Sequence, residues 1–346
     1  MTSDKEYCMS SWLMFRTIAD RGKCFAEGVV DYHVFPAAVR TPVHDSHELE
    51  AALQNEVAKA ARGRRLAIAL SGGIDSAILA SMMPQGSVAY TFKCVVPGKE
   101  VVDETAQAAR YAAYCGLEHR VVEVYWEDML AYAPVLMKHK GAPVHSIEVQ
   151  IYKAACQVKR DGFDSLVFGE SADVLYGGMS GLLSKDRTVG DMIDRYSYVL
   201  PYKALKHPQL ITEPYTRWEK DGYVDVHRFV GDTFFEESTN SYENACATAG
   251  LDLCMPFSRT FLDTELDIAR VRSGENKYLV REVFNRRYPG WEIPAKTPMP
   301  RPLNEWMAGW KGPQRPEFWP HCTDEMTGDQ KWYVWALERF LNIIEP

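Results

Sequence analysis

The sequence predicts an α/β fold: a doubly wound parallel sheet followed by a mainly helical C-terminal part. Short apolar runs alternate with helical stretches between residues 46 and 180, and this alternation is typical of parallel strands covered by helices on both faces. After residue 180 the alternation stops. We therefore expect an N-terminal extension over residues 1–45, an α/β core over 46–180, and a mainly helical region over 181–346 that completes the same domain.

Each element of the core has its own local signal. Residues 46–62 have the pattern of an amphipathic helix, with Ser46 as a candidate N-cap and acids in the first turn. An apolar helix is expected directly after the first strand and its glycine turn. Residues 181–240 are rich in aromatic residues with little periodicity, and a helical region interrupted by prolines completes the chain. The remaining apolar and helical patterns predict strands over 66–70, 88–92, 120–124 and 165–168, and helices over 103–115 and 147–160.

Length, composition and charge bound the class of protein. The chain has 346 residues, of which 46% are hydrophobic and 25% charged, an ordinary globular composition. No apolar run reaches the length of a membrane span, and the N-terminus lacks the layout of a signal peptide, so we expect a cytoplasmic protein. The formal net charge of −8 argues against non-specific binding of nucleic acid. Neither a nucleic acid nor a membrane is therefore expected as a partner.

The cysteine and histidine spacing argues against a zinc or iron–sulfur site. The 8 cysteines are scattered without a C-x-x-C pair, and the 9 histidines form no H-E-x-x-H motif. Several cysteines, such as Cys94 and Cys156, stand in apolar surroundings. Buried free thiols in a reducing compartment are the simplest interpretation.

The glycine turn Ser71-Gly72-Gly73-Ile74-Asp75-Ser76 is the most informative stretch of the chain. Glycines let the backbone approach an anion closely, and successive N–H groups together with the serine hydroxyls can surround a phosphate. A carboxylate repels phosphate, so Asp75 is best explained as a ligand of Mg²⁺ that bridges to phosphate oxygens. The chain has no G-x-x-x-x-G-K-[ST] loop. A strand-to-helix turn without a ligand is the alternative.

This turn resembles the SGGxDS loop of the ATP pyrophosphatase superfamily, whose fold is adenine nucleotide α-hydrolase-like. The resemblance implies that ATP is cleaved between its α and β phosphates, that AMP is transferred to an oxygen, and that the loop holds the pyrophosphate. On the loop alone, amide ligases, NAD synthetases, GMP synthetases and RNA thiolation enzymes all remain open.

A second stretch, LVFGESADVLYGG over residues 166–178, narrows the resemblance. It is similar to the S-G-E-G-[SA]-D-E-x-x-G-G stretch in the synthetase domain of asparagine synthetases and β-lactam synthetases. The resemblance implies that Asp173 is a second Mg²⁺ ligand and that Glu170 is catalytic beside the acyl-adenylate. Ser171 stands where a glycine is usual, and Val174 replaces an acid. Capping of the loop is the alternative role for both acids.

Further family marks extend the resemblance over about residues 50–310. Asp103-Glu104 matches an acidic pair after the second strand, with helix N-terminal charge as the alternative. AGLDLCMPF at 249–257 is similar to a family segment in which an arginine is common, and KYLVRE begins with Lys277. In the segment 293–306, Lys296 takes the position of a catalytic lysine. The residues expected to contact ATP or pyrophosphate are Ala69, Leu70, Ser71, Gly72, Gly73, Asp75, Ser76, Phe92, Cys94, Gly169 and Lys277.

Together these features predict an ATP- and Mg²⁺-dependent amide ligase that forms AMP and pyrophosphate. A small-molecule carboxylate is adenylated and its acyl group passes to ammonia or an amine, with Glu170 as base and Lys296 as electrostatic support. The acceptor pocket is expected near His145, Glu148 and Tyr176 and the aromatic segment 181–240. Because only 70 residues precede the loop, and Thr2 stands where the family's glutaminase has its cysteine, a separate glutaminase is a possible partner.

Three alternatives stay open. The first alternative is an enzyme of the same class that closes an amide ring within one substrate. In such members of the family, however, a tyrosine is common at the position of Glu170. A sulfur or RNA enzyme is disfavoured by the acidic charge and the lack of paired cysteines. The third alternative is a catalytically silent nucleotide-binding homologue.

Overall fold

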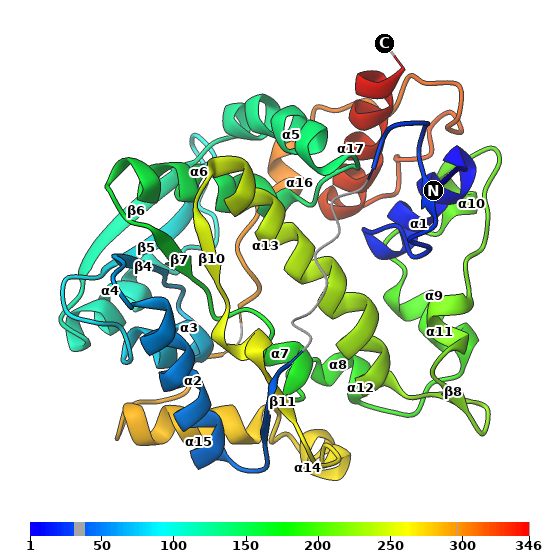
Figure 1. Cartoon of the computed structure of the whole chain (residues 1–346). Helices are drawn as coiled ribbons and strands as arrows, with labels where there is room; N and C mark the ends of the chain where they lie inside the picture. Colours follow the sequence, from blue (N-terminus) through cyan, green and yellow to red (C-terminus); the bar gives the residue numbers. More distant parts are fainter. Residues whose placement is uncertain (31–38, 296, 346) are drawn as a thin grey trace.

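A five-stranded parallel sheet forms the centre of the fold, in a computed structural model that describes residues 1–30, 39–295 and 297–345 (Figure 1). Its strand order is β10-β7-β4-β5-β6, and every pairing in it is parallel. This confirms the predicted α/β class and the strands predicted over 66–70, 88–92, 120–124 and 165–168. The observed bounds are β4 Leu66–Ala69, β5 Val88–Cys94, β6 Glu118–Val124, β7 Ser165–Val167 and β10 Asp252–Cys254.

The edge strand β10 was not predicted as a strand, because it has three residues and none of them is fully buried. It lies in the segment 249–257 and pairs with β7, from Asp252 opposite Ser165 to Cys254 opposite Val167. A segment from the C-terminal half of the chain therefore completes the sheet of the α/β core. The sheet therefore includes a strand from the region 181–346, beyond the residues 46–180 that we expected to form the α/β core.

The helices of the core are α2 Ser46–Ala60, α3 Ile74–Ala80, α4 Thr105–Tyr114, α5 Trp126–Lys140 and α6 Ser146–Arg160. The predicted helices are confirmed, but the N-cap of α2 is Asp45, whose carboxylate accepts from the N–H groups of His47 and Glu48. The Ser46 hydroxyl accepts a hydrogen bond from Arg286 instead. Helix α5 was not predicted, because Pro134 lies inside it and its apolar pattern is weak.

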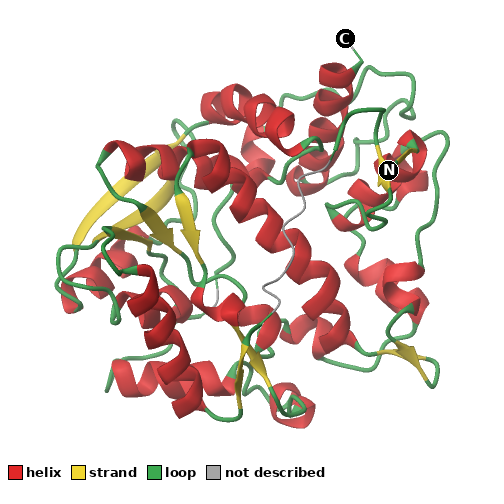
Figure 2. Cartoon of the chain, in the orientation of Figure 1, coloured by secondary structure: helices red, strands yellow, loops and turns green. Residues whose placement is uncertain are grey.

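Helices cover both faces of the sheet, as expected for a doubly wound fold (Figure 2). Successive strand side chains point to opposite faces, so one strand contributes to two cores. Ala67 and Ala69 of β4 face the core that contains α5 and α6, whereas Leu66 and Ile68 face the core that contains α2, α3 and α4. The apolar runs of the strands thus reflect burial on both sides.

The C-terminal part is mainly helical, as predicted. The aromatic segment folds into short helices, and a long helix, α13 Phe235–Ala249, then crosses the molecule beside the sheet (Figure 1). A single π-helical turn, η1 Val230–Phe234, leads into it. The other elements are α7 Ala172–Leu175, α8 Ser180–Leu183, α9 Val189–Tyr196, α10 Pro201–Ala204, α11 Glu213–Thr216, α12 Val226–Phe229, η2 Pro256–Arg259, α14 Ile268–Arg272, α15 Tyr278–Arg287, α16 Leu303–Trp306 and α17 Gly328–Ile344.

The N-terminal residues are built into the fold rather than appended to it. Strand β3 Thr41–Val43 pairs with β11 Thr260–Leu262 in parallel, and helix α1 Lys5–Phe15 packs against α17. The Trp12 indole donates to the carbonyl oxygen of Tyr333 at 3.0 Å. Two small sheets complete the description: β1 Thr2–Ser3 with β2 Lys23–Cys24, and β8 Glu219–Lys220 with β9 Tyr223–Val224.

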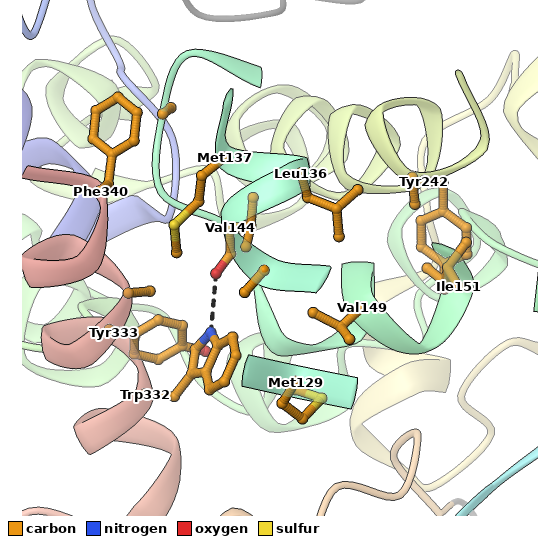
Figure 3. Close-up of a cluster of buried hydrophobic side chains, with 14 of the residues drawn as sticks. Met129, Leu136, Met137, Val144, Val149, Ile151, Tyr242, Trp332, Tyr333 and Phe340 are labelled. Atoms are coloured by element: carbon orange, nitrogen blue, oxygen red, sulfur yellow. Dashed lines mark hydrogen bonds between the residues drawn. The ribbon is translucent and has the colours of Figure 1, made fainter. Parts of the chain in front are cut away.

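Helices α5, α6, α13 and α17 contribute to one cluster of buried hydrophobic side chains (Figure 3). Trp332 of α17 lies among Met129 and Val149, and its indole N–H donates to the carbonyl oxygen of Val144 at 2.9 Å. Because the buried indole has a hydrogen-bond partner, this large side chain is accommodated without an unpaired donor. None of the described helices is both long and apolar enough to cross a membrane.

A buried polar network joins α1, α5, α6 and α13 beside this hydrophobic cluster. We use this name for Arg16, Lys140, His145, Glu148, Glu237, Ser241 and Asn244. The guanidinium of Arg16 binds the Glu237 carboxylate at 2.7 Å, and its other nitrogen lies 2.6 Å from His145 Nε2. Lys140 binds Glu148 at 3.0 Å, in a pair that is almost completely buried.

Aromatic rings and charged groups surround the Arg16 guanidinium of this network. The Arg16 guanidinium lies 3.9 Å from the centre of the Tyr198 ring. Burial raises the pKa of Glu237 to about 7, although the charge of Arg16 opposes this shift. Burial, and then the charge of Arg16, lower the pKa of His145 well below its usual value. The network therefore depends on its internal charge balance.

We expect Arg16→Ala to lower the free energy of unfolding by about 3 to 5 kcal/mol, because it leaves the buried Glu237 without its cation. The matched control is Arg217→Ala, which removes a largely exposed guanidinium from Glu213 and Asp232 and should cost no more than about 1 kcal/mol. Urea denaturation measures both. Equal effects of the two substitutions would contradict the importance of the buried pair.

Candidate active site

The glycine turn follows β4 at the carboxyl edge of the sheet and leads into α3. Its serines hold its shape: Ser76 Oγ accepts from the backbone N–H of Ser71 at 3.1 Å, and Ser71 Oγ accepts from the N–H of Gly73 at 3.1 Å. The two hydroxyls lie 3.0 Å apart. The turn is thus preorganised by its own side chains, and the cavity described below opens beside it.

The second loop follows β7 and touches the glycine turn directly. A Cβ atom at Gly169 would lie 2.8 Å from the backbone nitrogen of Ser76, so only glycine permits this approach. Ser171 adopts the left-handed conformation with φ 78°. This explains why the similar sequences usually have glycine there, since that conformation is costly for other residues.

The two loops bring Asp75 and Asp173 to one ammonium group. Lys277 Nζ lies 2.5 Å from Asp75 Oδ2 and 3.2 Å from Asp173 Oδ1. The lysine side chain is only 8% exposed. Although burial acts in the opposite direction, the charges of Asp75 and Asp173 raise the pKa of the Lys277 ammonium. The predicted convergence of the two acids is therefore observed, around a cation that comes from a third segment of the chain.

The donor set at this point fits a hard divalent cation that also binds phosphate. Mg²⁺ is commonly held by one or two carboxylates together with phosphate oxygens and water, and Asp75 and Asp173 supply two carboxylates at one place. Among the residues that the structure describes, no group of three or more His, Cys, Asp or Glu side chains is arranged to hold a metal. A metal held by these two carboxylates would complete its coordination with water or with oxygens of a bound ligand.

A cavity extends from these acids across the carboxyl ends of β4, β5 and β7, where ligands bind in open α/β sheets. Its lining combines polar and charged side chains with Phe92, Phe168, Met299 and Pro300. A cavity with both kinds of lining suits a ligand that has a charged group and an aromatic or apolar group. The predicted residues that line it are Ala69, Leu70, Ser71, Gly73, Asp75, Ser76, Phe92, Gly169, Glu170, Asp173 and Lys277.

The other predicted site residues that the structure describes lie outside this lining. Gly72 is beside it, against the Glu104 carboxylate. The thiol of Cys94 is buried and donates to the carbonyl oxygen of Pro300. Tyr176 is buried, with its hydroxyl 2.5 Å from Thr260 Oγ1. Lys296 lies outside the described residues, although its neighbours Ala295 and Thr297 line the cavity.

His145 and Glu148 belong to the buried polar network rather than to the cavity. His145 is the N-cap of α6 and accepts from the N–H of Ile147, and Glu148 accepts from the N–H of His145. These two residues therefore cap the N-terminus of α6. Their expected contact with an acceptor substrate stays a prediction.

Glu170 is held at the rim of the cavity by helix α13. The Ser238 hydroxyl donates to Glu170 Oε1 at 2.8 Å. Tyr242, one turn further along α13, lines the same cavity and packs edge-on against Phe168. Burial, and then the charge of Glu170, raise the pKa of Tyr242 well above its usual value. The cavity therefore contains a carboxylate with a defined orientation.

Sequence reasoning missed several cavity residues. Tyr242 lies in a helix for which no functional pattern was recognised, and Asn276 and Arg281 flank the recognised Lys277. Arg281 donates to the side-chain and backbone oxygens of Asn276. Glu104 was noted as half of an acidic pair, and it lies against the glycine turn. Burial raises the pKa of Glu104 to about 7.

Comparison with known proteins gives one strong family match. A family model described as asparagine synthase matches residues 48–312. None of the curated proteins matches the chain.

Several solved structures are distantly similar. An NMN synthetase from Francisella tularensis has 13% identity and a TM-score of 0.29, with 74% of this chain and 99% of that chain covered. An NH3-dependent NAD synthetase from Campylobacter jejuni has 12% identity and a TM-score of 0.27, with 74% and 100% covered. A predicted subunit of a tRNA methyltransferase from Methanocaldococcus jannaschii has 13% identity and a TM-score of 0.24, with 65% and 88% covered. These similarities are too distant to support a function.

We expect the free energy of unfolding of the Glu104→Gln variant to increase, relative to that of the unaltered protein, as the pH rises. The raised pKa means that folded Glu104 keeps its proton at a pH where the unfolded chain has lost it, so this group lowers the free energy of unfolding between about pH 5 and pH 8. Glutamine lacks this titration. The stability of the variant relative to the unaltered protein should therefore increase by on the order of 2 kcal/mol across that range.

Denaturant unfolding at pH 5 and pH 8 measures this difference. Glu100→Gln changes an exposed carboxylate four residues away and serves as the control. A pH-independent difference for Glu104→Gln would show that its carboxyl is not perturbed by burial.

Proposed function

Because the chain belongs to the asparagine synthase family, a family of ATP-using synthetases, we propose that it is an amide ligase that forms AMP and pyrophosphate. In the proposed reaction a carboxylate oxygen of a small molecule attacks the α-phosphorus of ATP. The resulting acyl-adenylate then reacts with ammonia or an amine. Mg²⁺ is the proposed metal, and it would neutralise charge on the phosphates.

The observation that supports this proposal most is the meeting of Asp75, Asp173 and Lys277 beside the glycine turn. Pyrophosphate formation concentrates negative charge at one place, so the site must supply cations and N–H donors there. Lys277 provides a fixed ammonium with a raised pKa, and the turn provides hydroxyls and backbone N–H groups. Asp75 and Asp173 would hold the metal, with their charge balanced by Lys277 before it binds.

Glu170 is the proposed base of the second step. An attacking amine must lose a proton as the amide bond forms, and a carboxylate at the cavity rim can accept it. The family places an electrostatically supporting lysine at the position of Lys296. A glutamate at position 170, where cyclising relatives commonly have tyrosine, favours transfer to a separate amine over ring closure.

The amine is proposed to arrive as free ammonia, as an amine substrate or from a separate glutaminase. The cysteines among the described residues are all free thiols, which supports a reducing compartment and hence the cytoplasm. No nucleic acid or membrane is part of the proposal.

A screen of amino acids and small diacids, with ATP, Mg²⁺ and with or without ammonium, should detect AMP and pyrophosphate with at least one acid. Asp75→Asn and Asp173→Asn should each reduce this activity at least 100-fold, because each removes a proposed metal ligand. Asp263→Asn, at a largely exposed position, is the matched control and should retain activity. Release of ADP and phosphate would contradict the mechanism.

Glu170→Gln should separate the two steps. We expect ATP–pyrophosphate exchange, which reports adenylation, to remain within a few-fold of the unaltered protein, while amide formation falls about 100-fold or more because the base is lost. Circular dichroism controls for folding. Equal losses in both steps would indicate that Glu170 supports the structure of the site rather than the proton transfer.

A further inference from the structure

We infer that Ser238 is a positioning residue that fixes the Glu170 carboxylate for its part in the second step. This inference rests on the proposed function, and it assigns a task to helix α13, in which no sequence motif was recognised. Its basis is a direct contact: the Ser238 hydroxyl donates to Glu170 Oε1 at 2.8 Å, with Ser238 itself 5% exposed.

The partner of this hydroxyl differs from the partners of two threonines on α13. Thr239 and Thr248 each donate to the carbonyl oxygen four residues earlier in the same helix, which is the usual arrangement for a hydroxyl inside a helix. The Ser238 hydroxyl instead donates to Glu170, which lies outside the helix in the loop after β7. The hydroxyl is therefore used to hold the loop.

The loop itself gives Glu170 a defined backbone but leaves its side chain free to rotate. Gly169 is fixed by its close approach to the glycine turn, and Ser171 by its left-handed conformation. The carboxylate needs a separate contact to restrict its rotamers. Ser238 supplies one such contact, and Tyr242, which interacts with the same carboxylate, supplies another.

Helix α13, which carries Ser238, is anchored by buried contacts with other segments of the chain. Directly before Ser238, Glu237 binds the buried Arg16 guanidinium at 2.7 Å. One turn and two turns further along, Ser241 and Asn244 donate to the Glu148 carboxylate at 3.3 and 2.7 Å. The buried polar network thus anchors α13, and it includes Arg16, the C-cap residue of α1, which precedes the family-matched region 48–312.

The experiment compares Ser238→Ala with Thr239→Val. The control removes a neighbouring buried hydroxyl that bonds only within its own helix. We expect Ser238→Ala to slow amide formation about 10-fold, with ATP–pyrophosphate exchange changed less than threefold, as for loss of a hydrogen bond to a charged group. Thr239→Val should change neither rate by more than threefold.

A double variant tests whether Ser238 acts through Glu170. In the Glu170→Gln background, Ser238→Ala should cause little further loss of amide formation, because the group that it positions is already removed. Independent, multiplicative losses would overturn the inference, as would a uniform decrease of both steps. Ser238→Thr, which keeps the hydroxyl, should recover most of the activity.

A crystal structure of the Ser238→Ala variant gives a readout that does not depend on catalysis. The Glu170 carboxylate should leave its position or occupy more than one rotamer. A carboxylate in the unchanged single position would overturn the inference. If the unaltered protein forms no AMP with any acid, the proposed function fails, and this structural comparison still decides the role of Ser238.

Discussion

The ammonium group of Lys277 between two carboxylates is the interaction on which the site depends. Asp75, Asp173 and Lys277 come from segments separated by about a hundred residues each, and they meet only because the backbone is closely packed there. A Cβ atom at Gly178 would overlap the side chains of Asp173 and Lys277. Lys277 itself has a left-handed backbone, with φ 56°. The charge cluster thus forms where the backbone is tightly packed at Gly178 and where Lys277 adopts a conformation that is unfavourable for a residue with a side chain.

In this cluster the Lys277 ammonium is paired with the carboxylates of Asp75 and Asp173, and another cation could replace it as their partner. Two neighbouring, partly buried carboxylates without a cation would repel each other, and Lys277 offsets that repulsion. If the metal and phosphates of the proposed reaction neutralised the acids instead, the same ammonium would be placed to bind phosphate oxygens. One side chain therefore serves both the stability of the protein alone and its proposed chemistry.

Much of the α/β core could be predicted because its signals are local. Strands buried on both faces are continuous apolar runs, and the two loops carry glycines and acids in a recognisable order. Strand β10 and helix α5 were missed because one is short and half-exposed and the other contains Pro134. The convergence of Asp75 and Asp173 followed from parallel strands that end at one edge of the sheet.

The support of the site could not be predicted in the same way. Arg16, Glu237 and Ser238 are ordinary polar residues in segments without a motif, and their roles depend on which helices pack together. His145 and Glu148 were recognised as a cluster, but burial against Arg16 and Lys140 is a property of the tertiary structure. Sequence patterns therefore located the groups proposed to meet the substrate better than the groups that hold them in place.

The packing of α1 against α17 has a consequence for how this protein can be cut or fused. Both segments lie outside the matched region 48–312, yet Trp12 and Tyr333 bury each other through a hydrogen bond and an edge-on ring contact. A fragment trimmed to the matched region would expose the apolar surface that these segments now cover. Minimal versions of this protein should therefore retain both terminal helices, and a fused partner needs a linker that leaves their contact intact.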